Sequence, residues 1–290
     1  MTAFRWIEGV GGEIVADGKS LEAVAYGPPP DQAPTIVMLH EGLGCVALWR
    51  DFPAKLAAAT GHGVFAYSRV GYGGSERIDL PRPLDYMSRE ARFSLPAVLE
   101  AIGFERGILL GHSDGASIAA IYAGEHSDER MKGVVLMAPH VFTEEMGLAS
   151  IAEARRAYEA GDLRAKLAKY HTHVDSAFCG WNGAWLDPGF RAWNIEDAVG
   201  RWSVPALLIQ GVDDQYGTMA QIRAIEARSP APVTSLILEA CRHSPQIDQT
   251  QATLDAIARF LRRGRGGEGA VSPTKSRLTS RPLTPTSGRR

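Results

Sequence analysis

The pentapeptide GHSDG at positions 111–115 constrains this chain more than any other stretch. It follows a short apolar run at 107–110 and opens a second apolar run at 116–123. An apolar strand, a serine with a glycine two positions before and two after it, and then a helix make up a nucleophile elbow. The glycines are needed because a side chain at either place would collide with the neighbouring strand or helix. We therefore expect Ser113 to stand at the carboxyl end of a strand, beside the free N–H groups that open the next helix.

The chain around this turn alternates between strand and helix patterns. The run at 35–39 is continuously apolar or β-branched, as in a strand buried on both faces. Further strands are predicted at 21–26, 63–67, 107–110, 133–138, 205–210 and 234–238. Helices are predicted at 46–60, at 85–102 with a kink at Pro96, after Ser113 to about residue 125, at 219–228 and at 252–262. This alternation predicts an α/β fold, with a mostly parallel sheet and helices on both of its faces.

The rhythm changes between 141 and 199. Two helices are expected at 144–160 and 163–173, followed by an aromatic-rich stretch without a strand pattern. We interpret 141–199 as a helical cap inserted between two strands, and 1–140 with 200–263 as the core. Residues 264–290 hold six Lys or Arg and one acid among Gly, Pro, Ser and Thr, which predicts a disordered basic tail.

Composition excludes several classes of protein. The net charge of −2 gives no reason to expect a nucleic-acid partner, and the basic tail is more simply a solvated one. Cys45, Cys179 and Cys241 form an odd set without metal-ligand spacing, which indicates reduced thiols in a cytoplasm. No stretch resembles a signal peptide, and none has 18 consecutive apolar residues, so we expect neither secretion nor a membrane span.

Three residue types found after the predicted strands suit nucleophilic catalysis. A serine hydroxyl becomes a useful nucleophile when a histidine accepts its proton and a carboxylate fixes the tautomer of that histidine. His243 follows the strand at 234–238 and is the only histidine after residue 173. Asp213 and Asp214 both follow the strand at 205–210, and either could supply the carboxylate. Loops at the carboxyl ends of parallel strands meet at one edge of the sheet, so these groups can converge on Ser113.

From about residue 21 to 261 the chain resembles an α/β-hydrolase fold enzyme with a helical cap. LHEGLG at 39–44 is similar to the oxyanion loop, YSRVGYGGS at 67–75 to the loop after the fourth strand, and QGVDD and CRHS to the acid and base loops. The resemblance implies that Ser113 attacks a carbonyl, that His243 acts as base and then as acid, and that Asp214, rather than Asp213, orients His243. It also implies that the backbone N–H groups of Asp114 and of Gly42 (or Glu41) form the oxyanion hole.

Two positions depart from the family's pattern. Arg242 precedes the histidine where glycine is frequent, and Glu41 stands in the oxyanion loop where glycine is common. We expect Glu41 to hydrogen-bond its own loop or the loop of Arg69. Among the other histidines, His40 is interpreted as stabilising its loop, and His112, which points away across the elbow, as structural. His171 and His173 are predicted to lie on different faces of a helix, so a shared metal is not expected.

The resemblance implies a serine hydrolase that cleaves carboxylic esters, or related acyl bonds, of a small and partly apolar substrate, without cofactor or metal. The expected pocket residues are Glu41, His140, Trp181, Trp185 and Trp193. Carbon–carbon bond hydrolysis and acyl transfer on the same triad stay open, as does a ligand-binding or signalling module that hydrolyses little.

Overall fold

A computed structural model of the chain describes residues 4–265 and 277–279. Its centre is one sheet of strand order β1-β2-β4-β3-β5-β6-β7-β8-β9. Neighbours are parallel except in the pairs β1–β2 and β2–β4. The strands are β1 (Gly12–Ala16), β2 (Lys19–Tyr26), β3 (Thr35–Leu39), β4 (Gly63–Tyr67), β5 (Gly107–His112), β6 (Met131–Met137), β7 (Ala206–Gly211), β8 (Val233–Leu238) and β9 (Arg277–Thr279).

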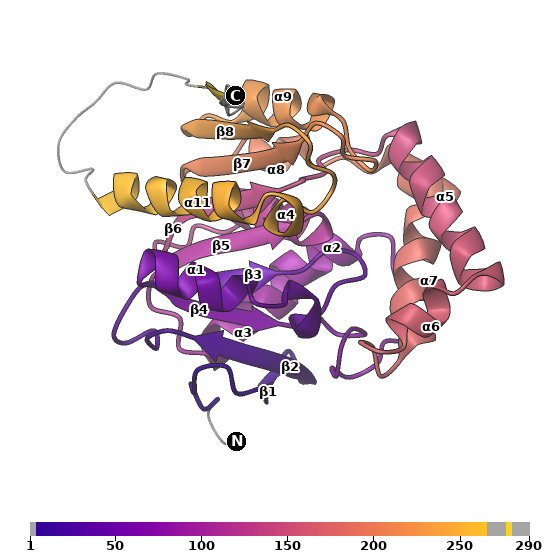
Figure 1. Cartoon of the computed structure of the whole chain (residues 1–290), viewed down its shortest axis with the longest axis horizontal. Helices are drawn as coiled ribbons and strands as arrows, with labels where there is room; N and C mark the ends of the chain where they lie inside the picture. The colour runs from indigo at the N-terminus through magenta and orange to yellow at the C-terminus, as the bar shows by residue number, and fades with distance from the viewer. Residues whose placement is uncertain (1–3, 266–276, 280–290) are drawn as a thin grey trace, which may run out of the picture.

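Helices cover both faces of this sheet, which confirms the predicted fold class (Figure 1). One face carries α1 (Phe52–Thr60) and α11 (Thr250–Arg265), which pack on each other. The other carries α2 (Tyr86–Arg89), α3 (Leu95–Ala101), α4 (Asp114–Glu125), α8 (Glu196–Val199) and α9 (Met219–Arg228).

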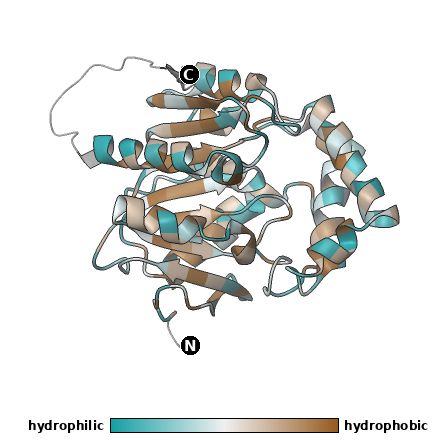
Figure 2. Ribbon diagram, in the orientation of Figure 1, coloured by the Kyte–Doolittle hydropathy of each residue, from teal (hydrophilic) through white to brown (hydrophobic). Residues whose placement is uncertain are grey.

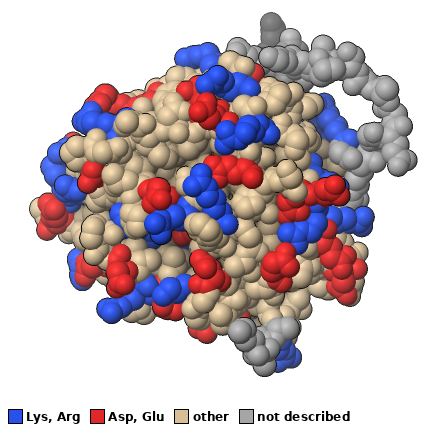
Figure 3. All heavy atoms as spheres, turned by 180° about the vertical axis from the view of Figure 1, so that it is seen from behind, with Lys and Arg blue, Asp and Glu red and all other residues tan. Residues whose placement is uncertain are grey.

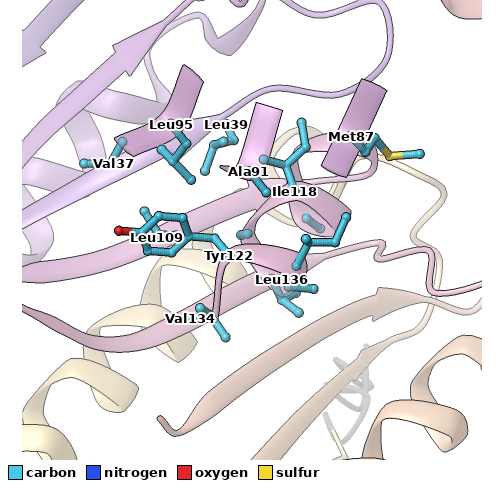
Figure 4. Close-up of a cluster of buried hydrophobic side chains, with 14 of the residues drawn as sticks. Val37, Leu39, Met87, Ala91, Leu95, Leu109, Ile118, Tyr122, Val134 and Leu136 are labelled. Atoms are coloured by element: carbon cyan, nitrogen blue, oxygen red, sulfur yellow. The ribbon is translucent and has the colours of Figure 1, made fainter. Parts of the chain in front are cut away.

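Alternate residues of each central strand point to opposite faces, and so the strands contribute to two cores. In β3, Ile36 and Met38 join the core under α1 and α11, whereas Val37 and Leu39 join the core under α3 and α4 (Figure 4). Both faces of the strand are therefore buried, as its unbroken apolar sequence predicts. Colouring by hydropathy shows the apolar strands inside and an α11 that is polar along much of its length (Figure 2).

Three local features differ from the sequence prediction. The β1–β2 hairpin was not expected, although it turns at Asp17 and Gly18, both with positive φ, as an Asp-Gly hairpin requires. The helix expected at 46–60 is divided into a 3₁₀ turn, η1 (Val46–Trp49), and α1. The helix expected at 85–102 contains a π turn, η2 (Glu90–Ser94), which ends just before Pro96.

A helical segment between β6 and β7 lies beyond the ends of the strands (Figure 1). It comprises α5 (Glu145–Ala160), α6 (Leu163–Leu167), α7 (Val174–Trp185) and η3 (Pro188–Ala192), and α8 follows it on the face of the sheet, packed against α4 and α9. The first two helices were predicted, with α6 shorter than expected, and α7 was not. The expected tail at 264–290 lies mostly outside the described residues; within it, α11 continues to Arg265, and β9 pairs with β8.

Candidate active site

Ser113 sits in a strained turn between β5 and α4. Its φ of 53° and ψ of −117° are unusual for a residue other than glycine, and its N–H donates to Met137 O on β6 at 2.9 Å. A Cβ on Gly111 would lie 2.2 Å from Gly115 O, and a Cβ on Gly115 would lie 2.1 Å from Leu39 O. The turn therefore closes only because both flanking residues lack a side chain.

His243 and Asp214 form a hydrogen-bonded pair on the loops after β8 and β7. His243 Nδ1 lies 2.9 Å from each carboxylate oxygen, and Gln210 Nε2 and the Tyr216 N–H also donate to that carboxylate, both at 2.8 Å. Burial alone would raise the pKa of Asp214, but these hydrogen bonds and the attraction of His243 lower it to about 2. The ionised carboxylate keeps the proton on Nδ1, which leaves Nε2 able to accept another.

The two aspartates of the QGVDD loop differ in environment. Asp214 is buried, whereas Asp213 is exposed and makes no hydrogen bond to His243 within the described residues. Arg242, beside the histidine, is also exposed, and its N–H donates at 2.9 Å to Asp248, the last residue of α10 (Pro245–Asp248).

Ser113 and His243 line one cavity of about 90 Å³ at the carboxyl edge of the sheet. Within the described part of the chain, the Ser113 hydroxyl makes no hydrogen bond to another side chain, including that of His243. The His243 ring lies among those of Tyr216, His112 and His140, with centroids 4.7, 5.1 and 5.7 Å away. The hydroxyl and the histidine thus line one cavity without a hydrogen bond between them in this structure.

Two N–H groups predicted as oxyanion donors are available at this cavity. Gly42 and Asp114 both line it, the Asp114 N–H opens α4, and the Gly42 N–H has no acceptor among the residues that the structure describes. Arg69 holds the loop of Gly42 in place. Its N–H donates to His40 Nε2 at 3.0 Å, and its Nη2 donates to Glu41 O at 2.9 Å. His40 therefore has the structural place that the sequence predicted.

The Glu41 carboxylate lies against its own loop, as predicted, and also has a partner that the sequence did not indicate. The carboxylate turns to His112, whose Nδ1 lies 3.4 Å away, while His112 Nε2 donates to His243 O at 2.7 Å. Burial would raise the pKa of Glu41, but the contact with His112 lowers it to about 2. Glu41 is therefore ionised at neutral pH, and His112 connects the loops of Gly42 and His243.

Four of the five predicted pocket residues line the cavity: Glu41, His140, Trp181 and Trp185. Trp193 does not; it stacks on Phe190, 5.3 Å between centroids, outside the lining. Sequence reasoning missed Leu43, Glu144, Gly147, Ile151 and Tyr216. Of these, only Tyr216 had a signal, since it lies two residues after Asp214.

Asp114 also has a side-chain role that was not predicted. Its carboxylate accepts from Tyr86 Oη and, at 3.2 Å, from Trp185 Nε1, while the buried Arg69 guanidinium lies 4.0 Å away. Burial is the largest influence and raises the pKa of Asp114. This carboxylate therefore joins the elbow to α7.

No group of three or more potential metal ligands occurs in the described ranges. The His171 ring lies between the Gly73 N–H at 2.9 Å and Leu43 O at 3.0 Å, so it ties the helical segment to two core loops. Nor does any helix there combine the length and apolarity that crossing a membrane requires.

Comparison with known proteins gives matches over part of the sequence. A family model described as alpha/beta hydrolase fold matches residues 34–173. Epoxide hydrolase B of Mycobacterium tuberculosis is 35% identical over 118 residues, which are 41% of this chain and 32% of that protein. The chain thus matches about a third of the length of that curated relative.

Solved structures resemble nearly the whole fold. A membrane phospholipase A has a TM-score of 0.72 at 19% identity, covering 89% of this chain and 87% of that one. The enol-lactonase from Burkholderia xenovorans LB400 has a TM-score of 0.66 at 19% identity, covering 87% and 100%. With the sheet order, the elbow and the motif order described above, these matches show that the chain has the α/β-hydrolase fold.

Proposed function

We propose that this protein is a serine hydrolase that cleaves carboxylic esters, or related acyl bonds, of a small and partly apolar substrate. The observation that carries the proposal is the pairing of His243 with the buried Asp214 carboxylate in the cavity that also contains Ser113. Hydroxyl, imidazole and carboxylate are the three groups that acyl transfer through a serine requires.

In the proposed mechanism, Ser113 Oγ attacks the substrate carbonyl and His243 Nε2 accepts the hydroxyl proton. The N–H groups of Gly42 and Asp114 donate to the oxyanion of the tetrahedral intermediate. His243 then returns the proton to the departing alcohol, which leaves an acyl-enzyme. Water, deprotonated by His243, attacks the acyl carbon, and breakage of the bond to Ser113 Oγ releases the carboxylic acid and restores the hydroxyl.

Cavity size and lining support a small substrate. About 90 Å³ is well below the 300–1,000 Å³ typical of sites for drug-sized ligands. Trp181, Trp185 and Ile151 come from the helical segment, so we propose that 141–199 acts as a cap over the serine. We also place the protein in the cytoplasm, because its three cysteines are free thiols.

Among the relatives, the names lactonase and phospholipase refer to ester bonds, which Ser113 can attack. Epoxide opening, named for the curated relative, suits this elbow less well. Attack of a serine oxygen on an epoxide carbon gives an ether, which water does not cleave at neutral pH, whereas attack on an ester gives another ester that it can cleave.

Turnover of p-nitrophenyl acetate and butyrate, followed by p-nitrophenolate release, tests the proposal, with Ser113→Ala as the matched control. We expect turnover that the substitution abolishes, together with labelling of Ser113 by a fluorophosphonate. Labelling without turnover would instead indicate a ligand-binding module, and no labelling at all would contradict the proposal. Product analysis with an added alcohol as acceptor separates hydrolysis from acyl transfer.

A further inference from the structure

The Trp181 side chain on α7 has an unused hydrogen-bond donor at the cavity. The residue is only 6% exposed and lines the cavity, yet its Nε1–H has no acceptor among the described residues. Among the other buried indoles, Trp185 Nε1 donates to Tyr86 Oη and Asp114, and Trp202 Nε1 donates to Ala120 O, whereas Trp49 Nε1, outside the cavity lining, has no partner among the described residues. Unlike that of Trp49, the Trp181 nitrogen is not fully buried, so its N–H can donate to an acceptor on a ligand that occupies the cavity.

The indole edge lies directly against Gly42. A Cβ built on Gly42 would be 2.1 Å from Trp181 Nε1 and 2.4 Å from Cδ1. The indole thus occupies the space that a side chain at position 42 would fill, with its nitrogen beside the residue expected to donate to the oxyanion. Glycine at this position and tryptophan on α7 are complementary in shape.

Neighbouring contacts hold the indole in this place. Asn182, the next residue, donates from Nδ2 to Ile151 O at 2.9 Å and accepts from Arg155 Nε at 2.7 Å, which fixes α7 to α5. The Phe178 ring packs edge-on against Trp181 at 6.0 Å between centroids. The donor is therefore positioned before substrate arrives, as electrostatic stabilisation of a transition state requires.

We propose that Trp181 is a catalytic residue, whose Nε1–H donates to the substrate oxygen that becomes the oxyanion, alongside the N–H groups of Gly42 and Asp114. The proposal deepens the proposed function and rests on it. The helical segment then contributes one oxyanion donor. The site is therefore complete only when α7 packs against the loop of Gly42.

Trp181→Phe tests the role, because phenylalanine keeps an aromatic ring and removes the N–H. Removing one oxyanion donor typically lowers kcat by about 10²-fold or more, and we expect a loss of that order with p-nitrophenyl butyrate while KM changes little. Trp193→Phe is the matched control, since that ring lies on the same helical segment outside the cavity lining. Unchanged kcat in Trp181→Phe, or a loss equal to that of the control, overturns the proposal.

A binding measurement tests the role of Trp181 separately from the proposed hydrolase activity. Butylboronic acid forms a tetrahedral anionic adduct when Ser113 Oγ adds to boron and the hydroxyl proton passes to His243. By calorimetry we expect Trp181→Phe to bind it at least about tenfold more weakly than the native protein. Equal affinity overturns the role of Trp181 even where no ester is turned over, and no binding to the native protein overturns both proposals.

Thermal unfolding tests the placement independently of activity. Gly42→Ala should lower Tm more in the native background than in Trp181→Phe, because the added methyl meets the indole nitrogen edge. Equal losses in the two backgrounds would show that the indole does not rest on Gly42, which also overturns the proposal.

Discussion

At the scale of single residues, two adjacent aspartates allow the proposed role of one carboxylate to be isolated. Asp214→Asn replaces the acceptor of the His243 Nδ1 proton with an amide, which permits the wrong tautomer, and we expect kcat for p-nitrophenyl butyrate to fall by about 10³- to 10⁴-fold. Asp213→Asn changes an exposed side chain next to it and should leave kcat as it is. Equal effects of the two substitutions would remove the acid role from Asp214.

His140 gives the folded protein a dependence on pH. Burial, with a smaller effect from His243, lowers the pKa of His140 from 6.5 to about 3, so the unfolded chain binds a proton below pH 6.5 that the folded protein does not. The free energy of unfolding therefore falls as pH drops from 6.5 towards 3. In urea titrations between pH 6.5 and 4.5, we expect His140→Asn to reduce this slope by up to about 1.4 kcal/mol per pH unit. If the free energy of unfolding changed with pH by the same amount in the native protein and in His140→Asn, this prediction would be contradicted.

Some residues of the site could be predicted from the sequence and others could not, for a physical reason. Ser113 and His243 could be placed in one cavity from sequence, because strand ends bring their loops to one edge of a sheet. The partner of Glu41 could not, since it depends on how the His112 ring turns towards the carbonyl of His243, 131 positions away in the chain. Contacts between loops of this kind leave no local pattern in the sequence.

At the scale of elements, the elbow depends on the approach of α4 to β3. Gly115→Ala would place a methyl carbon 2.1 Å from Leu39 O, and since backbone cannot move aside easily, we expect a loss of at least about 2 kcal/mol in the free energy of unfolding. Gly183→Ala is the control: it lies within α7 with no atom within 4 Å of the added carbon, and should stabilise by about 0.5–1 kcal/mol. Chemical denaturation measures the free energy of unfolding of both variants. Equal values for the two would contradict the close approach of α4 to β3 at Gly115.

Most elements followed from local pattern, and the misses have identifiable causes. The strands of the parallel sheet are buried on both faces, so their apolar runs stood out. Helix α7 contains two glycines and several aromatic residues, which weaken helix propensity, and it is formed by packing of Phe178, Trp181 and Trp185 onto the core and the other helices. That spacing of three and four residues was a helical signal in itself.

At the scale of the whole molecule, the site is assembled from distant parts of the chain. The loops after β3, β5, β7 and β8 meet at one edge, and the helical segment between β6 and β7 supplies the opposite wall. Sequence order predicts the first arrangement, because parallel strands end together, but the position of an inserted segment depends on tertiary contacts such as that of Trp185 with Asp114. On the outer surface acidic and basic side chains are interspersed over the face seen in Figure 3.

The cavity is lined by acidic side chains without basic ones, in contrast to the mixed charges of the outer surface. Glu41 and Glu144 line it, Glu41 is ionised, and no lining residue of the described chain is Lys or Arg. A substrate carboxylate about 6 Å from one of these groups, at an effective dielectric constant of about 20, is repelled by about 3 kcal/mol, or about 10²-fold in kcat/KM. We therefore expect 4-carbamoylphenyl acetate to be hydrolysed about 10²-fold more efficiently than the isosteric anion 4-carboxyphenyl acetate. Glu41→Gln should reduce the ratio of the two kcat/KM values, and turnover of the neutral ester by this variant checks that its site is intact. Equal kcat/KM values for the two esters in the native protein would show that the cavity carboxylates do not select substrate charge.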